Sequence, residues 1–356
     1  MIPLLINNSY KHEHSEGEFQ DYMNQSTPFC SRFRDEPWYC SMLLVLFIIS
    51  LPVGVLGNIV AILNYTCCRR SWTTGTVFLL NLALCDFTWL LVLPFTFYFT
   101  LLHPHTPNIH IFCQFKKIFF NINVNGSIIF LALISFDRYT GTVHPISSLR
   151  WWNSRKACLC CFCTWLLLLL GSIPDFFMAF AHRGAGNTTL CIGHLYGPLN
   201  YMSAISLVRM LVGFLLPLGV MGALYSRMIR VLTSMSGRLE RKSCRGQRGS
   251  ARRTTKPLLL ITAALVVFVV SYMPYHIMIL TLVFMQFTGT ITDKNVNTLY
   301  TACEFFEALC SMSSCLDPLL YILASERFLK SWRRLRSSTR QLFCRASRRV
   351  GVQEPA

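Results

Sequence analysis

Seven long apolar stretches constrain the fold of this chain more than any other feature of its sequence. Each can cross the roughly 30 Å hydrocarbon core of a bilayer as a helix, which takes about 20 residues. Backbone amides find no water in hydrocarbon, so a spanning segment must satisfy them internally. The predicted spans are residues 41–68, 75–101, 112–136, 157–180, 200–226, 257–287 and 297–323. We therefore predict an all-α membrane protein, a seven-transmembrane helix bundle embedded in the lipid bilayer.

The charge distribution predicts how the bundle is oriented. Of the 356 residues, 53% are hydrophobic and only 14% charged, yet the net charge is +17. A strong positive charge is typical of chains that bind nucleic acid. However, 25 of the 33 Lys and Arg residues follow the first, third, fifth and seventh spans. The positive-inside rule makes these segments cytoplasmic, which puts the N-terminus outside and the C-terminus inside. We expect no nucleic-acid partner.

The remaining segments divide the chain into three expected parts. Residues 1–40 form an extracellular N-terminal tail, 41–323 the seven-span domain, and 324–356 an amphipathic helix with a cytoplasmic tail. N-glycosylation sequons on the expected outer side begin at Asn7, Asn24 and Asn187. These features predict a multi-pass glycoprotein of the plasma membrane.

A short helix parallel to the membrane is predicted after the seventh span. Between Ser325 and Arg336, Phe328, Leu329, Trp332 and Leu335 fall on one side of a helix, with Lys or Arg on the other. Such a helix is suited to the inner leaflet. Cys344, a few residues further on, is a candidate for palmitoylation, with a free cytosolic thiol as the alternative.

Charged residues within the spans are the candidate functional residues, because an ionisable group in the membrane must face the protein interior and find a partner there. Asp86 lies within the second span, and its expected polar company is Ser127, Ser313, Ser314 and Asp317. At the end of the third span, Asp137-Arg138-Tyr139 places an arginine at the headgroup edge or inside the protein. Pro274 predicts a kink in the sixth span, because proline removes one helical hydrogen bond.

Several motifs occur in the order typical of one receptor family. They are Gly57-Asn58, Asn81-Leu82-Ala83-Leu84-Cys85-Asp86, Asp137-Arg138-Tyr139, Trp165, Pro217, Pro274 and Asp317-Pro318-Leu319-Leu320-Tyr321. Over residues 40–336 the chain resembles the rhodopsin-like (class A) G-protein-coupled receptors. The resemblance implies an extracellular ligand in the outer half of the bundle and a heterotrimeric G protein as partner.

The resemblance also implies roles for particular residues. It implies a G-protein coupling switch made of Asp137, Arg138, Tyr139, Asp317, Pro318 and Tyr321. It implies a sodium ion held by Asp86, Ser127, Ser313 and Asp317, with a polar cluster lacking any ion as the alternative. It implies a disulfide between Cys113 and Cys191. No other metal and no cofactor are expected.

Finer features resemble the purinergic nucleotide receptors within this family. They are the stretch from Cys113 to Ser127, the stretch from Tyr139 to Pro145, Tyr272 in place of the family's usual Trp, and Asp317 in place of its usual Asn. Two departures concern the ligand. Where nucleotide receptors hold phosphates with cations, this chain has Ile279 and Glu307.

The residues expected to reach the ligand are Lys117, Asn121, Arg183, Arg209, Tyr272, Tyr275, His276, Ile279, Glu304 and Glu307. Lys117 and Arg209 are expected to clamp a small anionic, nucleotide-like ligand, with His276 donating a hydrogen bond, because cations with several donors suit anionic oxygens. Two alternatives stay open. The charges form an internal salt-bridge network, or Glu304 and Glu307 hold a zwitterionic, amine or peptide ligand.

Other classes of protein fit the sequence less well. Nucleophile-elbow, zinc-helix and phosphate-loop motifs are absent, so we expect no enzyme. A retinal-type light sensor needs a lysine in the seventh span, and residues 297–323 contain none. A transporter should show internal repeats or paired broken helices, and no convincing repeat is present. It remains a distant alternative.

Overall fold

The computed structural model describes residues 37–67, 72–98, 109–178, 199–242, 248–292 and 295–324. Some predictions lie outside these residues. They are the sequons at Asn7, Asn24 and Asn187, the expected ligand residue Arg183, Cys191, the membrane-parallel helix of 325–336, and Cys344.

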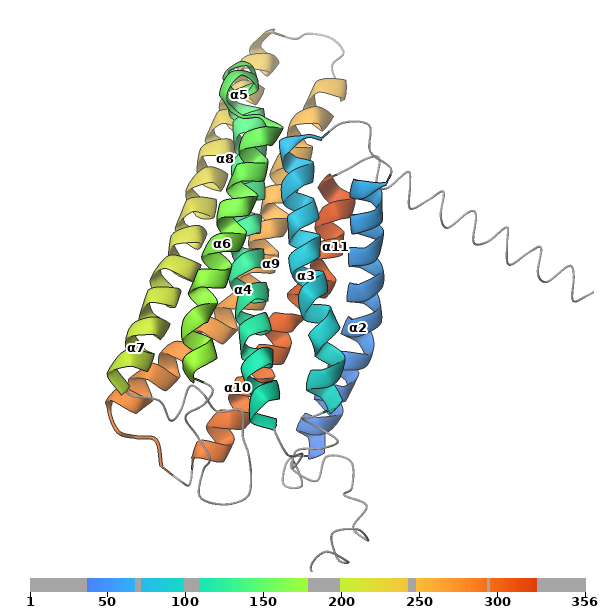
Figure 1. Ribbon diagram of the computed structural model, residues 1–356. Coiled ribbons are helices and arrows are strands. Elements are labelled where there is room, and N and C mark those ends of the chain that lie inside the picture. Colours follow the sequence, from blue (N-terminus) through green and yellow to red (C-terminus); the bar gives the residue numbers. More distant parts are fainter. Residues whose placement is uncertain are drawn as a thin grey trace, which may run out of the picture.

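The described residues form helices and contain no strand. In chain order these are α2 (Pro37–Thr66), α3 (Thr74–Phe97), α4 (Ile109–Val143), α5 (Pro145–Trp151), α6 (Ser154–Met178), α7 (Leu199–Val208), the π-helical segment η3 (Arg209–Leu215), α8 (Leu216–Lys242), α9 (Arg248–Phe287), α10 (Val296–Ser311) and α11 (Ser313–Ala324). Seven stretches of the described chain are long and apolar enough to span a membrane. One combines α7, η3 and α8, another α10 and α11. This confirms the predicted seven-span bundle (Figure 1).

Three helices extend well past their predicted spans, α4 and α8 at their C-terminal ends and α9 at its N-terminal end, where it begins at Arg248 and not at residue 257. The third span was predicted to end at residue 136, but α4 continues to Val143; the fifth was predicted to end at 226, but α8 continues to Lys242. Hydropathy marks where the lipid contact ends, whereas a helix persists while its backbone hydrogen bonds and neighbours support it. Asp137 and Arg138 are therefore held inside a continuous helix and do not begin a loop.

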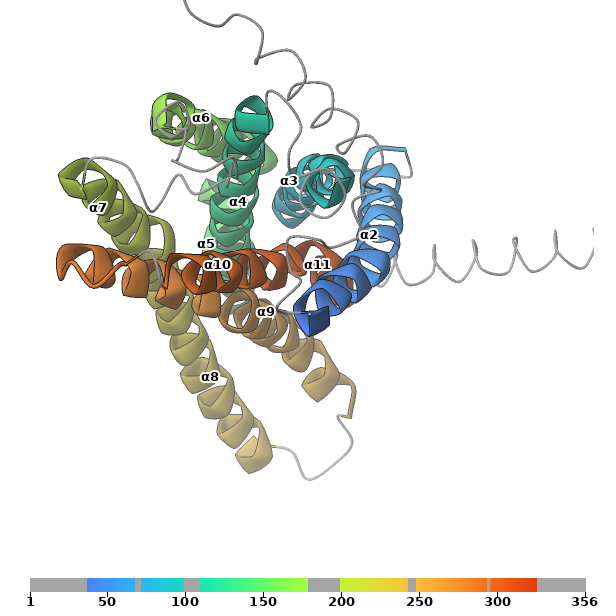
Figure 2. The same cartoon turned by 90° about the horizontal axis from the view of Figure 1, so that it is seen from below.

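The helix α4 occupies the centre of the bundle. It contacts α3, α5, α6, η3, α8, α9 and α10, and the view along the bundle shows it between α6 and α3, with α10 across its lower end (Figure 2). In its most apolar stretch 67% of residues are buried, against 22% for α2. Polar side chains on α4 therefore face other helices.

The outer surface of the bundle is apolar and the interior is partly polar. Leu166, Leu167 and Leu170 of α6 are exposed, whereas Asp86 and Asp317 are fully buried. Lipid solvates leucine well and gives a carboxylate no partner. The polar interior is therefore where a functional site is to be sought.

The first and last spans pack closely at one glycine. A Cβ placed on Gly57 of α2 would lie 2.4 Å from the ring of Pro318 in α11. Only glycine allows the two helices to approach this far. Below, the end of the bundle where α5 lies, at the top of Figure 1, is called the α5 end; α7 and α10 begin at the opposite end.

Candidate functional site

The buried polar residues gather in three groups at different depths. The charged network, toward the opposite end, comprises Lys116, Lys117, Asp175, Arg209, Glu304 and Glu307. The polar knot, in the middle, comprises Asn58, Asp86, Asn123, Ser127, Ser314, Asp317 and Tyr321. The pair Asp137 and Arg138 lies at the α5 end.

Asp175 of α6 is the centre of one half of the charged network. Its Oδ1 accepts from Arg209 Nη1 at 2.9 Å, and its Oδ2 accepts from Arg209 Nη2 at 2.7 Å. Asn121 Nδ2 also donates to Oδ2 at 2.8 Å, and Lys117 Nζ lies 3.9 Å from Oδ1. Only 3% of the Asp175 side chain is exposed. A bidentate guanidinium pair of this kind is strong and fixes geometry, so it ties α4, α6 and η3 together.

The π-helical segment η3 positions the arginine of this pair. Arg209 is its first residue, and Arg209 Nη2 also donates to the carbonyl of Gly171 at 2.8 Å. Within η3, a Cβ on Gly213 would lie 2.7 Å from Oδ1 of Asn125, so η3 and α4 are in close contact. Single π-helical turns are frequent at functional sites.

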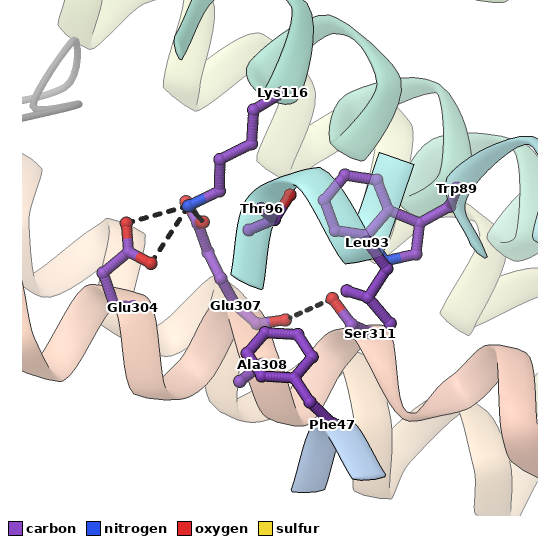
Figure 3. Close-up of a pocket in the computed structure, with 9 residues that line it drawn as sticks. All are labelled: Phe47, Trp89, Leu93, Thr96, Lys116, Glu304, Glu307, Ala308 and Ser311. Atoms are coloured by element: carbon purple, nitrogen blue, oxygen red, sulfur yellow. Dashed lines mark hydrogen bonds and ion pairs between the residues drawn. The ribbon is translucent and has the colours of Figure 1, made fainter. Parts of the chain in front are cut away.

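Lys116 of α4 is the centre of the other half. Its Nζ lies 2.8 and 3.0 Å from the carboxylate oxygens of Glu304 and 3.1 Å from Oε2 of Glu307. Figure 3 shows this ammonium group between the two glutamates of α10, at one side of a pocket. Here one cation pairs with two carboxylates, whereas in the other half two cations pair with the single carboxylate of Asp175.

Taken together, the network contains three cations and three anions, and every one of them has an oppositely charged partner. The expected clamp residues Lys117 and Arg209 do come together, but around Asp175. Glu304 and Glu307 come together around Lys116. This arrangement matches the internal salt-bridge network that the sequence left open as an alternative.

The expected ligand residues of α9 lie buried within the bundle. His276 Nδ1 hydrogen-bonds the carbonyl of Tyr272 at 2.8 Å, and its ring stacks on Phe214 with centroids 4.2 Å apart. Tyr275 contacts Phe120 edge to face at 5.2 Å. Ile279 packs against the apolar core. One nitrogen of His276 is thus engaged by its own helix.

Sequence reasoning missed Asp175 and gave no role to Lys116. Asp175 is the only charged residue within the predicted fourth span, 157–180, so the rule that intramembrane charges are functional candidates would have found it. Lys116 and Lys117 are neighbours about 100° apart on a helix. Which of them meets the glutamates depends on how α4 is rotated, and this cannot be seen in sequence.

In the polar knot, side chains of α4 and α11 converge on Asp86 of α3. Its Oδ1 accepts from Ser314 Oγ at 3.1 Å, Ser127 Oγ at 3.2 Å and Asn123 Nδ2 at 3.3 Å. Tyr321 OH donates to Asp86 Oδ2 at 3.3 Å and to Asn58 Oδ1 at 3.0 Å. Within the described chain, Ser314 and not the predicted Ser313 bonds Asp86.

The polar knot also contains oxygens that lack a donor. Both carboxylate oxygens of Asp317 and the amide oxygen of Asn123 are buried without a hydrogen-bond partner in the described part of the chain. Leaving a buried acceptor unpaired is costly. Oxygens from carboxylates, amides and hydroxyls are the ligands of hard cations, so these residues fit the sodium ion that the resemblance implies.

At the α5 end, two donor groups contact the Asp137 carboxylate, one at each oxygen. Arg138 Nη2 lies 3.2 Å from its Oδ2, and Trp152 Nε1 donates to its Oδ1 at 3.0 Å. The Trp152 ring stacks on Phe78 of α3 at 6.0 Å. A Cβ on Gly75 would lie 1.8 Å from Arg138 Nη2, so the guanidinium fits there only because residue 75 has no side chain.

The residues expected to form one coupling switch occupy different places. Asp137 and Arg138 form the α5-end pair, whereas Asp317 and Tyr321 lie in the polar knot. Tyr139 packs against the apolar cluster of Met228, Leu232 and Ile261. Cys113 is in a disulfide; its expected partner Cys191 lies outside the described residues.

Comparison with known proteins adds independent evidence. Residues 57–321 match the family model described as 7 transmembrane receptor (rhodopsin family). Purinoceptor 1 of Rattus norvegicus is 29% identical over 307 residues, which cover 85% of this chain and 77% of the relative. Purinoceptor 6 of Mus musculus is 30% identical over 295 residues, covering 81% and 86%. The type-1 angiotensin II receptor A of Xenopus laevis is 26% identical over 287 residues, covering 80% and 76%.

Asp175→Asn tests the ion pairing within the network. The change leaves Lys117 and Arg209, whose side chains are only 14% and 21% exposed, without the carboxylate they share, and breaking a fully buried pair typically costs about 3–5 kcal/mol. We expect the thermal unfolding midpoint of the purified protein in detergent to fall by at least about 5 °C. Glu307→Gln, which leaves Lys116 paired with Glu304, should have a smaller effect.

The double variant Asp175→Asn/Arg209→Gln removes one charge of each sign and should recover part of the loss, because coupled residues are not additive. Losses that simply add in the double variant would argue against the pair.

Proposed function

The chain belongs to the rhodopsin family of seven-transmembrane receptors, and from this premise we propose that it is a plasma-membrane receptor that binds a small anionic ligand and activates a heterotrimeric G protein. The basic segments after α2, after α4, between α8 and α9, and after α11 support a cytoplasmic α5 end, by the positive-inside rule. The charged network then opens to the extracellular side.

One observation carries the ligand proposal. Lys117, Asn121 and Arg209 already bind a carboxylate, that of Asp175, with the donors an anion requires. An anionic group of the ligand would take the place of Asp175 on these donors. A nucleotide-like ligand is the first candidate, because two of the relatives above are named purinoceptors.

The alternative expected from the sequence is a zwitterionic, amine or peptide ligand held by Glu304 and Glu307. The contacts of Glu304 and Glu307 support it, because these two carboxylates already bind an ammonium group, that of Lys116. An angiotensin II receptor is also among the relatives, so the similarity is not confined to purinoceptors. The family is one of receptors, which leaves little support for a transporter or an enzyme.

A signalling screen tests the ligand class. Nucleotides, carboxylates and amines would be applied to cells expressing the native chain, with G-protein activation as the readout. We expect anionic compounds to activate the receptor, and Lys117→Ala or Arg209→Ala to reduce their potency at least about tenfold, roughly the effect of losing one charge-assisted hydrogen bond.

Receptor expressed at the surface would be measured in parallel, so that loss of folding is separated from loss of binding. If Glu307→Gln alone abolishes the response while both cation variants respond normally, the anion clamp is wrong.

We further propose that the polar knot holds a sodium ion on Asp86, Asp317 and the oxygens around them. When bound, the ion would supply the positive charge that two adjacent buried carboxylates lack. The protein's part is to keep the hydroxyls of Ser127 and Ser314 and the Asn123 amide directed at this site.

Sodium chloride should therefore raise the unfolding midpoint of the purified protein relative to choline chloride at equal ionic strength. Asp86→Asn should remove this difference, because it takes away one of the two carboxylates. Equal midpoints in both salts for the native chain would count against an ion in the knot.

For coupling, we propose that Arg138 is held at rest by Asp137 and released on activation, when α9 moves outward about Pro274. Each state of a switch needs its own contacts. At rest, the Arg138 guanidinium contacts the Asp137 carboxylate and occupies the space beside Gly75. Trp152 holds the same carboxylate through its other oxygen.

Asp137→Asn should raise basal G-protein activation, because the amide binds the guanidinium more weakly than the carboxylate does. Arg138→Ala should abolish coupling with surface expression kept. Trp152→Phe retains the ring and loses only the N–H, so a smaller rise in basal activity is expected, whereas Trp151→Phe should change nothing. Unchanged basal and agonist signalling in the Asp137 and Arg138 variants would exclude this role.

A further inference from the structure

Arg209 is the member of the charged network that opens toward the lipid-facing surface of the bundle. Its Nη2 donates to the carbonyl of Gly171, an exposed residue of α6 where an added Cβ would meet no atom within 4 Å. The Arg209 side chain is 21% exposed, against 3% for that of Asp175. The backbones of α6 and η3 approach each other at few points. The guanidinium therefore lies between these two helices and can be reached from outside the bundle.

The surface on both sides of Arg209 is apolar. Leu167 and Leu170 of α6 are exposed, and so are Val208 of α7 and Val212 of η3. Exposed apolar side chains are ordinary on a membrane helix, because lipid solvates them. A charged side chain that is partly open to such a surface is rare, since intramembrane charges almost always face the protein interior. Arg209 is therefore a candidate contact for a molecule that lies in the lipid.

The depth of Arg209 indicates which part of a lipid molecule would meet it. Its bidentate partner Asp175 lies in the last turn of α6, which ends at Met178, and the apolar span of this helix ends at Phe176. At 1.5 Å per residue, Asp175 is about 5 Å from that end of the helix. With the α5 end cytoplasmic, as proposed above, this is the level at which the outer-leaflet headgroups begin.

Arg209 also retains donors for an anionic headgroup. A guanidinium group carries five N–H donors. Among the described residues, Asp175 accepts from two of them and Gly171 from one, so two remain. Lys117 Nζ lies 3.9 Å from the same Asp175 carboxylate. Two cations thus share one carboxylate at this place, which favours the approach of a further anion.

We propose that the ligand is an anionic amphiphile of the outer leaflet. Its phosphate or carboxylate group binds Arg209 from the lipid-facing side, and its single hydrocarbon chain lies in the bilayer along α6 and η3. A guanidinium group suits both headgroups, because its N–H pairs match their oxygens. The proposal rests on the anion-binding role proposed above for Arg209 and names the class of anion. The chain needs no cavity inside the bundle.

The test uses n-alkyl phosphates of two to twelve carbons, with inorganic phosphate as the probe without a chain. Binding would be measured by calorimetry on the full-length chain in phosphatidylcholine nanodiscs, with the signal of empty nanodiscs subtracted. We expect the affinity, referred to the aqueous concentration, to rise about threefold to fourfold per methylene group, the gain of moving one such group into lipid. Alkyltrimethylammonium ions of equal length should not bind.

Gly171→Leu adds a side chain beside the exposed guanidinium and retains the pair of Arg209 with Asp175, because the space there is open. We expect it to weaken the binding of dodecyl phosphate at least about tenfold, with the thermal unfolding midpoint kept. Gly141→Leu, at an equally open and exposed glycine near the α5 end, is the matched control and should leave binding unchanged. Arg209→Gln should abolish binding.

Three outcomes would overturn the lipid-facing site. Phosphates that bind equally with and without a chain, and lose binding in Lys117→Ala and Arg209→Ala, would keep the anion site and exclude the approach from lipid. Chain-dependent binding that persists in Gly171→Leu and Arg209→Gln would show that the hydrocarbon chain alone drives it. Loss of binding in nanodiscs containing phosphatidylglycerol would assign the site to a resident phospholipid. No binding at any chain length would instead refute the anion site on which the proposal rests.

Discussion

Lipid gives a buried charge no partner, and this constraint accounts for most of the structure described above. It forces each of the seven spans into a helix, and it turns the polar side chains of those helices toward one another. Because a charge taken out of water must be matched by one of opposite sign, Lys117 and Arg209 meet Asp175, and Lys116 meets Glu304 and Glu307. The ion pairs that result join α4 to α6, η3 and α10.

The central helix α4 contributes to all three polar groups. It supplies Lys116 and Lys117 to the charged network, Asn123 to the polar knot and Asp137 to the α5-end pair. A shift or rotation of α4 against its neighbours would therefore change contacts at every depth of the bundle. This gives a contiguous physical connection between the two ends of the bundle.

The sequence was sufficient to predict the seven spans, because span length and hydropathy follow from the thickness of the bilayer. It also indicated that Asp86 and Arg209 lie inside the bundle, and it left Arg138 either at the headgroup edge or inside the protein. It did not reveal which cation pairs with which carboxylate. That Lys116 and not Lys117 meets the glutamates depends on the rotation of α4, and that Arg209 reaches Asp175 depends on the π-helical turn of η3.

The contact between the first and last spans has a consequence for how the protein is made. Asn58 donates to the carbonyl of Ser314, 256 residues later in the chain, and accepts from Tyr321, 263 residues later. During synthesis α2 enters the membrane long before α11 exists. A chain truncated after α9 therefore leaves Asp86 with only its α4 donors, Ser127 and Asn123, and leaves Asn58 without its partners in α11. The hydrogen bonds of the polar knot are therefore complete only once the last span is in place.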